Sequence, residues 1–337
     1  MTSPSPQQLA QDYQRFNEGA GLVEAGPRTQ VQLTGQDRAG FLQGFCTNNL
    51  ETLKPGNGCE AFVTNLQGKI IGHVTIFCGS ESLVLETSGN QAERLIGHLD
   101  RYIIRDDVTL QDQSQVWHQW LIGGQQAATL LGQICADDVP SNELEHCETL
   151  LESIAVSIRN VPWSRNPCYS VNCLQEDASR IAEILAAAGI QRCLDETAET
   201  CRIEAGFPCY DMDLTENNLP QEASRDRQAI SFTKGCYLGQ ETVARIDALG
   251  HVNRKLRGLR FASAEVPAVG SELLVDDKSV AQVTSSCYSP GYQAALALAL
   301  VHRGHDEEGT MLAGPAGSAT VCTLPFQDPG PADETDQ

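Results

Sequence analysis

Basic residues are scarce in this sequence. Its 337 residues include 23 Lys and Arg against 44 Asp and Glu, which gives a formal net charge of −21 at pH 7. A field of that sign repels phosphate backbones and anionic lipid headgroups, because both are bound through clustered Lys and Arg. The composition therefore argues against nucleic acid as a direct partner.

Long apolar runs are also missing. No stretch approaches the roughly 18 consecutive apolar residues of a membrane-crossing helix. The beginning of the chain, MTSPSPQQLAQDYQRF, has neither the basic segment nor the apolar segment of a signal peptide. We therefore expect no membrane association and a cytoplasmic location.

Paired cysteines are absent, although cysteine itself is not rare. The chain has 13 cysteines, and none stands in a CxxC pair or beside histidines at metal-ligand spacing. Scattered cysteines in a long chain favour a reducing compartment over a disulfide framework. We expect no structural zinc site, and we assign no metal ligand.

What is present predicts an α+β fold with antiparallel sheets and packed helices. Apolar and polar residues alternate over 59–88, with turn residues between them, which predicts a meander of three antiparallel strands. The stretches 117–124 and 150–160 are expected as single strands. The apolar spacing at 125–135 and 177–188 is typical of helices.

The character of the sequence changes after Gly250. Short apolar stretches are broken there by Gly, Pro and Asp turns, without a helical pattern, which predicts a small β-barrel over 251–326. The last residues, 327–337, are acidic and rich in proline, and we expect them to form a disordered tail. Residues 1–250 then form the α+β region.

Lysine and arginine, which are rare in this chain, occur close to a cysteine in TKGCYLGQETVAR, residues 233–245. Gly239 permits a tight turn, and a helix is predicted from Gln240 to Gly250, so Cys236 precedes a helix amino terminus. With Lys234 and Arg245 nearby, the thiolate of Cys236 would be favoured. Alternatively, Cys236 is a small buried apolar residue and the charges are solvated.

A polar, irregular stretch precedes this motif at 201–223. Loops of this length in a compact domain are commonly functional. Its carboxylates either cap helices and turns or line a ligand cleft; they are Glu204, Asp211, Asp213 and Glu222.

The pattern Lys-Gly-Cys-Tyr-x-Gly-Gln-Glu, followed by Ala-Arg, resembles the signature of the YgfZ family of folate-binding proteins. The resemblance extends to LTGQDRAGFLQGFCTNNL, HLDRYIIRDDVTL, RIEAGFP and LPQEA, and thus to nearly the whole chain. YgfZ-like proteins are in turn similar to the glycine-cleavage T-protein, a tetrahydrofolate-dependent aminomethyltransferase. The resemblance implies two interleaved α+β subdomains and a barrel around a folate channel.

The resemblance also implies a function and a site. It implies that the protein binds tetrahydrofolate and supports the synthesis or repair of iron-sulfur proteins, with radical tRNA-modifying enzymes as suspected clients. Cys236 and Lys234 would carry the chemistry. The residues expected to bind the cofactor are Asn48, Glu204, Tyr237, Gly239, Gln240, Glu241 and Arg245.

Two departures from the T-protein pattern disfavour glycine-cleavage activity. Gly72 and His73, in QGKIIGHV, stand where T-proteins have an acidic pair, and SRNPCYSVNC lacks the glutamate that helps to hold the pterin. His73 is then either a general base or simply a packed histidine.

Two other functions stay open. One is a folate-dependent aminomethyltransferase, methyltransferase or demethylase that uses other acids, such as Glu204 or Asp211. The other is a non-catalytic interaction scaffold.

Overall fold

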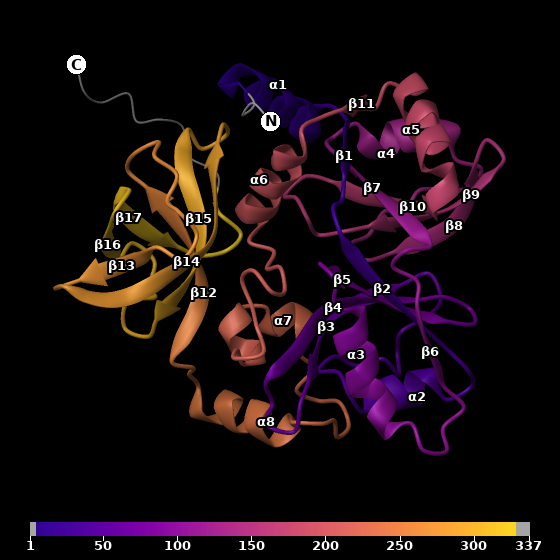
Figure 1. The fold of residues 1–337 in the computed structure, drawn as a ribbon, viewed down its shortest axis with the longest axis horizontal. Coiled ribbons are helices and arrows are strands. Elements are labelled where there is room, and N and C mark those ends of the chain that lie inside the picture. Colours follow the sequence, from indigo (N-terminus) through magenta and orange to yellow (C-terminus); the bar gives the residue numbers. More distant parts are fainter. Residues whose placement is uncertain (1–4, 328–337) are drawn as a thin grey trace.

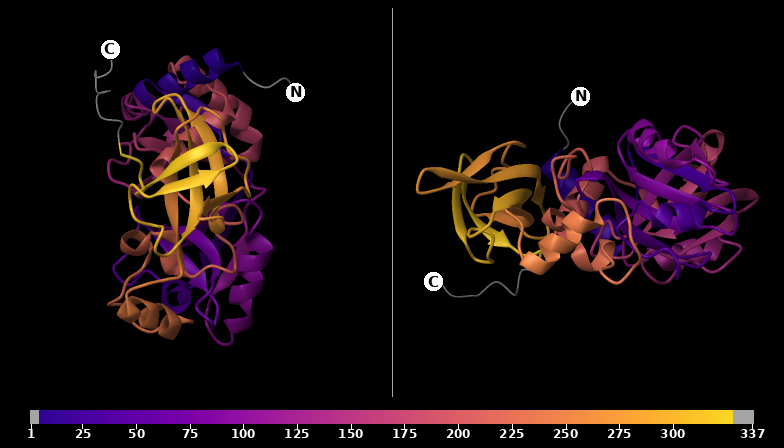
Figure 2. Two further views of the ribbon diagram at one scale, coloured as in Figure 1. Left: turned by 90° about the vertical axis from the view of Figure 1, so that its left-hand side faces the viewer. Right: turned by 90° about the horizontal axis from the view of Figure 1, so that it is seen from below.

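The computed structural model describes residues 5–327, which form two β-sheets with their helices and a closed β-barrel (Figure 1). The chain begins in one sheet, passes through the whole of the other, and returns to the first before it reaches the barrel. Figure 2 shows the barrel on one side of the molecule and the two sheets on the other, with helices between them.

The larger sheet has six strands in the order β11-β1-β7-β10-β9-β8. All neighbouring strands pair antiparallel except β1 and β11. Apolar residues of this sheet pack against two helices, which exclude water from one core. The elements are β1 (Gly21–Glu24), β7 (Trp117–Gly123), α4 (Ala127–Ile134), β8 (His146–Leu151), β9 (Ile154–Asn160), β10 (Cys168–Leu174), α5 (Ala178–Ala187) and β11 (Gln191–Arg192).

The second sheet has five strands in the order β3-β4-β5-β2-β6, and all of its pairs are antiparallel. The predicted meander is confirmed as β3, β4 and β5. Two helices cover its apolar side. The elements are β2 (Arg28–Thr34), α2 (Arg38–Gln43), β3 (Gly58–Thr64), β4 (Ile70–Cys78), β5 (Leu83–Ser88), α3 (Ala92–Leu99), η1 (Asp100–Tyr102) and β6 (Thr109–Asp112).

The predicted barrel is confirmed as a closed barrel in the order β12-β15-β14-β13-β16-β17. Closure leaves no strand edge unpaired, and the interior is filled by small and branched apolar side chains. The strands are β12 (Arg254–Phe261), β13 (Glu272–Val275), β14 (Lys278–Ser289), β15 (Ala294–His302), β16 (Met311–Gly314) and β17 (Gly317–Cys322). The α+β class with antiparallel sheets and a barrel is therefore correct.

Further helices join these parts. They are α1 (Pro6–Glu18), α6 (Asp195–Ala205), η3 (Pro220–Ala223), α7 (Asp226–Ala229) and α8 (Gln240–Leu249). Helix α6 lies against the barrel, where Ser289 of β14 donates a hydrogen bond of 2.5 Å to Glu204, and Tyr13 of α1 donates one of 2.9 Å to the same carboxylate. Glu204 thus joins three elements.

The structure corrects two local predictions and adds one central strand. Residues 150–160 form parts of two strands, β8 and β9, that turn back at Glu152. Residues 201–205 belong to helix α6 and are not irregular. Strand β10, in the centre of the larger sheet, has no counterpart in the sequence-based reading.

Three further predictions concern the tail, membrane spans and cysteines. The predicted tail at 327–337 lies, from 328 onward, outside the described residues. No helix within residues 5–327 is long and apolar enough to cross a membrane. All 13 cysteines are free thiols.

Candidate functional site

The lysine of the signature motif holds the motif to the rest of the molecule. Lys234 is 8% exposed, and its ammonium donates hydrogen bonds of 2.7, 2.7 and 2.8 Å to the backbone carbonyls of Gln43, Cys46 and Asn48. Burial lowers the pKa of Lys234. The sulfur at 3.9 Å from its Nζ is that of Cys46, whose pKa burial raises to about 11. The expectation that Lys234 acts on the thiolate of Cys236 is therefore corrected: its bonds go to residues 43–48.

Backbone contacts complete this attachment. The amides of Ser231 and Leu238 each donate a 2.9 Å hydrogen bond, to the carbonyls of Thr47 and Gly44. Gly239 has a positive φ of 83°, and a Cβ there would lie 2.3 Å from the carbonyl oxygen of Asn65. Only glycine fits such a position without displacing the β3–β4 turn. The loop at 231–239 is thus fixed against the five-stranded sheet.

Cys236 itself is exposed to solvent. The neighbouring Tyr237 is buried among apolar residues that include Phe62 and Val243, so the loop keeps its tyrosine inside and its cysteine outside. On the predicted helix, confirmed as α8, Glu241 and Arg245 are exposed and form no ion pair within 4.0 Å among the described residues. The thiol is therefore positioned for a partner that approaches from solvent.

A buried charged cluster lies where the T-protein resemblance places the acidic pair. His73 of β4 contacts Glu60 of β3, with 2.8 Å between Nε2 and Oε1. Arg225 donates to both oxygens of Glu60, through Nε at 2.9 Å and through Nη2. Burial alone would raise the pKa of Glu60, but the hydrogen bonds from Arg225 and His73 outweigh it and lower the pKa to about 2. Glu60 is thus ionised at neutral pH.

The same geometry fixes the role of His73. Its Nδ1 lies 3.1 Å from the carbonyl oxygen of Pro208, so both ring nitrogens face acceptors. Both ring nitrogens are therefore engaged by groups of the protein, and the packed reading of His73 fits better than the general-base reading.

Aromatic rings extend from this cluster toward the surface. His73 lies with its ring centroid 5.0 Å from that of Phe62 and 5.3 Å from that of Phe207. Phe207 in turn lies 5.8 Å from Trp163, which is half-buried. The guanidinium of Arg28 stacks on Trp163 at 4.0 Å. We call Phe62, His73, Phe207 and Trp163 the aromatic row.

A second buried carboxylate stands beside Arg28. Glu86 accepts hydrogen bonds of 2.8 Å from Arg28 and 2.6 Å from Arg159, and both pairs are buried. Nε and Nη1 of Arg28 have no hydrogen-bond partner within the described residues. Buried guanidinium donors are normally paired, so these two N–H groups offer unused capacity next to the aromatic row.

The other predicted residues lie apart from the aromatic row or hold structure. Asn48 donates to the carbonyls of Glu60 and Gln228, both at 2.8 Å. Glu204 lies at the barrel, and Gln240 begins α8. Asp213 pairs with the fully buried Arg202 at 2.8 Å, which favours the capping role for this carboxylate.

The two remaining carboxylates of 201–223 are also engaged. Glu222 accepts a hydrogen bond of 2.7 Å from Asn218. Asp211 accepts a bond from Gln91 and lies 3.5 Å from Arg94. None of these contacts tests a role in ligand binding, so those roles stay predictions.

No sequence pattern points to four residues of these clusters: Glu60, Arg225, Arg28 and Trp163. Glu60 and Arg225 are 165 positions apart, and nothing in the local sequence of either residue signals the contact. Within residues 5–327 no group of three or more His, Cys, Asp and Glu side chains could hold a metal.

Two sheets joined by an interleaved chain, followed by a closed barrel, make up a fold that a solved structure shares. The crystal structure of the glycine cleavage system aminomethyltransferase T from Bartonella henselae has this fold, with a TM-score of 0.85 at 17% identity, over 96% of this chain and 90% of that one. The sequence matches the GCVT N-terminal domain over residues 3–234 and the glycine cleavage T-protein C-terminal barrel domain over 254–328. The chain belongs to the GCVT family.

The sequence is also similar to aminomethyltransferases of two Bacillus species. The aminomethyltransferase of Bacillus velezensis is 27% identical over 312 residues, which are 90% of this chain and 84% of that protein. The aminomethyltransferase of Bacillus mycoides is 24% identical over 300 residues, 87% of this chain and 81% of that one.

Proposed function

We propose that this protein binds tetrahydrofolate and acts in one-carbon chemistry of the aminomethyltransferase type. Membership of the GCVT family supports the proposal. The residues present also suit the ligand, because a flat conjugated ring can stack on Trp163 or Phe207, and the unpartnered N–H groups of Arg28 can donate to its carbonyl or carboxylate oxygens. Tetrahydrofolate would supply a nitrogen that carries the one-carbon unit.

Calorimetric titration with tetrahydrofolate tests this proposal. We expect binding by the parent, and weaker binding by Trp163→Leu because a stacking surface is removed. Trp117→Leu is the matched control, since Trp117 is also half-buried but lies outside the aromatic row. Absence of binding by the folded parent would refute the proposal and leave an interaction scaffold.

The names of its relatives support aminomethyl transfer as what the protein does with folate. Such a transfer needs a carboxylate or other group that orients the reacting nitrogen and stabilises its charge. Glu60 is a buried carboxylate in contact with His73, at the place of the T-protein acids, but both of its oxygens accept hydrogen bonds from Arg225. A transferase would thus have to use another acid. Conversion of tetrahydrofolate to its methylene form with a candidate amine would establish this activity.

The second candidate is the YgfZ-like role, in which the protein supports synthesis or repair of iron-sulfur proteins. One observation favours it: Cys236 is exposed on a loop whose position Lys234 and Gly239 fix, with its thiol toward solvent. That placement suits contact with a client protein better than contact with a ligand in the aromatic row. Radical tRNA-modifying enzymes are the proposed clients.

Complementation in cells that lack the protein tests this role. Cys236→Ser and Cys236→Ala should both fail to restore the activity of iron-sulfur enzymes, because neither side chain can form a thiolate. Cys147→Ser, a change at a partly buried cysteine of β8, should restore it. Full activity of both Cys236 variants would show that the thiol is not used.

A further inference from the structure

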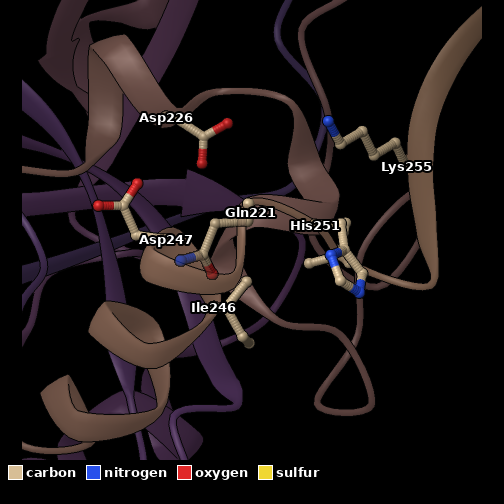
Figure 3. A pocket seen from close by; sticks show the side chains of 8 residues that line it. Gln221, Asp226, Ile246, Asp247, His251 and Lys255 are labelled. Atoms are coloured by element: carbon tan, nitrogen blue, oxygen red, sulfur yellow. The ribbon is translucent and has the colours of Figure 1, made fainter.

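A pocket lies between helix α8 and barrel strand β12, where four elements meet (Figure 3). Gln221 comes from η3, Asp226 from α7, Asp247 from α8 and Lys255 from barrel strand β12. The pocket has a volume of about 120 Å³, enough for a molecule of a few heavy atoms. It contains neither Cys236 nor a residue of the aromatic row.

Two of the lining acceptors have no partner. Gln221 is 7% exposed, and its Nε2 donates a 2.7 Å hydrogen bond to the carbonyl of Val243. This bond fixes the orientation of the amide, so Oε1 is the free end, and it has no hydrogen-bond partner among the described residues. Oδ1 of Asp226 also has none within that part of the chain. Buried oxygens are normally satisfied, so both indicate capacity for a donor.

The charges around the pocket are kept apart instead of being paired. Figure 3 shows the carboxylates of Asp226 and Asp247 on one side and the ammonium of Lys255 extending toward Asp226 from the other. Residues 5–327 provide no ion pair within 4.0 Å for either Asp226 or Lys255. Burial raises the pKa of Asp226, Lys255 lowers it and Asp247 raises it, so both of these charged groups act on Asp226 across the space.

Separated charges of opposite sign fit a ligand that carries both. We propose that this pocket binds a small zwitterion of the α-amino acid class, with its ammonium on Asp226 and Asp247 and its carboxylate on Lys255. Ile246 and the buried Val252 provide an apolar wall for a short aliphatic side chain. A divalent cation is disfavoured because Lys255 would repel it. Such a ligand would join α8 to the barrel, and the site is independent of the proposed folate site.

The test uses L-alanine and its two half-ligands. Ethylamine lacks the carboxylate and propionate lacks the ammonium, so each should bind at least about tenfold more weakly than L-alanine. Ligand-observed NMR titration of the full chain gives the three dissociation constants. Tetrahydrofolate titration of the same sample reports separately on the proposed function.

Variants locate the binding. Asp226→Asn and Lys255→Gln should each weaken L-alanine binding about tenfold or more, whereas Lys255→Gln should leave ethylamine binding equal or tighter, because a repelling cation is removed. Asp277→Asn and Lys278→Gln are matched controls, because both residues are exposed in the β13–β14 region of the barrel. If one of the two pocket variants does not fold, the other still shows whether L-alanine binds in this pocket.

Three results would overturn the proposal. They are no saturable binding of L-alanine, ethylamine binding as tight as that of L-alanine, and a calcium site that Asp226→Asn abolishes.

Discussion

Replacing Lys234 by methionine tests whether the signature lysine is a scaffold. Methionine keeps most of the length of the side chain but cannot donate to the carbonyls of Gln43, Cys46 and Asn48. A hydrogen bond to a charged group contributes about 1.5–3 kcal/mol, and losing several together is not additive. Removing the buried ammonium also removes its desolvation cost. We therefore expect a net loss of about 2–4 kcal/mol in the attachment of the loop.

Hydrogen exchange of two amides measures this loss where it occurs. The amides of Ser231 and Leu238 bond to Thr47 and Gly44 across the attachment, so they exchange when the loop separates. A loss of 2 kcal/mol corresponds to exchange about 30-fold faster. A local measurement is preferable because a chain of several domains rarely unfolds in two states.

Lys69→Met is the matched control. Lys69 donates a single 2.6 Å hydrogen bond, to the carbonyl of Asn217, at an exposed site. The substitution should cost about 1 kcal/mol or less and leave Ser231 and Leu238 unchanged. Unchanged exchange at these amides in Lys234→Met, together with lost function, would refute the scaffold role. It would indicate instead that Lys234 takes part in the chemistry of the protein.

Two further predictions concern the neighbouring sites. Gly239→Ala should destabilise the same attachment by at least about 1–2 kcal/mol, because φ is +83° and the new Cβ would lie 2.3 Å from the oxygen of Asn65. Gly235→Ala is the control: no atom lies within 4 Å of the added Cβ, so hydrogen exchange of the Ser231 and Leu238 amides should change little. Glu60 has a folded pKa of about 2, so it contributes about 3 kcal/mol above its unfolded pKa of roughly 4.3, and this is lost as pH falls toward 2. The difference in unfolding free energy between parent and Glu60→Gln should therefore shrink below about pH 4; a constant difference would contradict the ionised cluster.

The elements that the sequence predicts correctly each have a recognisable local sequence pattern. The barrel has turn residues between short strands, and α8 ends at Gly250 with a φ of 75°, the left-handed conformation that glycine adopts readily. Strand β10 lacks such a signal, because six of its seven residues are buried and no alternation results. The β8–β9 turn was missed because Glu152, a residue uncommon at positive φ, occupies a φ of 55°.

The interior of the site could not be predicted for a different reason. Helix α6 carries a fully buried arginine, Arg202, and so lacks the apolar stripe by which a helix is found. The Glu60 cluster depends on a contact between strand β3 and a residue 165 positions later. Sequence patterns report local periodicity, whereas this cluster is produced by the packing of distant segments.

The cluster also bears on whether the acidic pair of T-proteins could operate here. A side chain at position 72 would meet Leu95, since a Cβ added to Gly72 lies 2.8 Å from Cδ2 of this buried leucine. A carboxylate at position 73 would lie beside that of Glu60, in place of the imidazole that now contacts it at 2.8 Å. Two adjacent buried carboxylates cannot both remain ionised at low cost, and Arg225 alone would have to compensate both. The absence of the acidic pair is therefore built into the surrounding core, and an aminomethyl transfer in this protein would require both a different acid and a different arrangement of it.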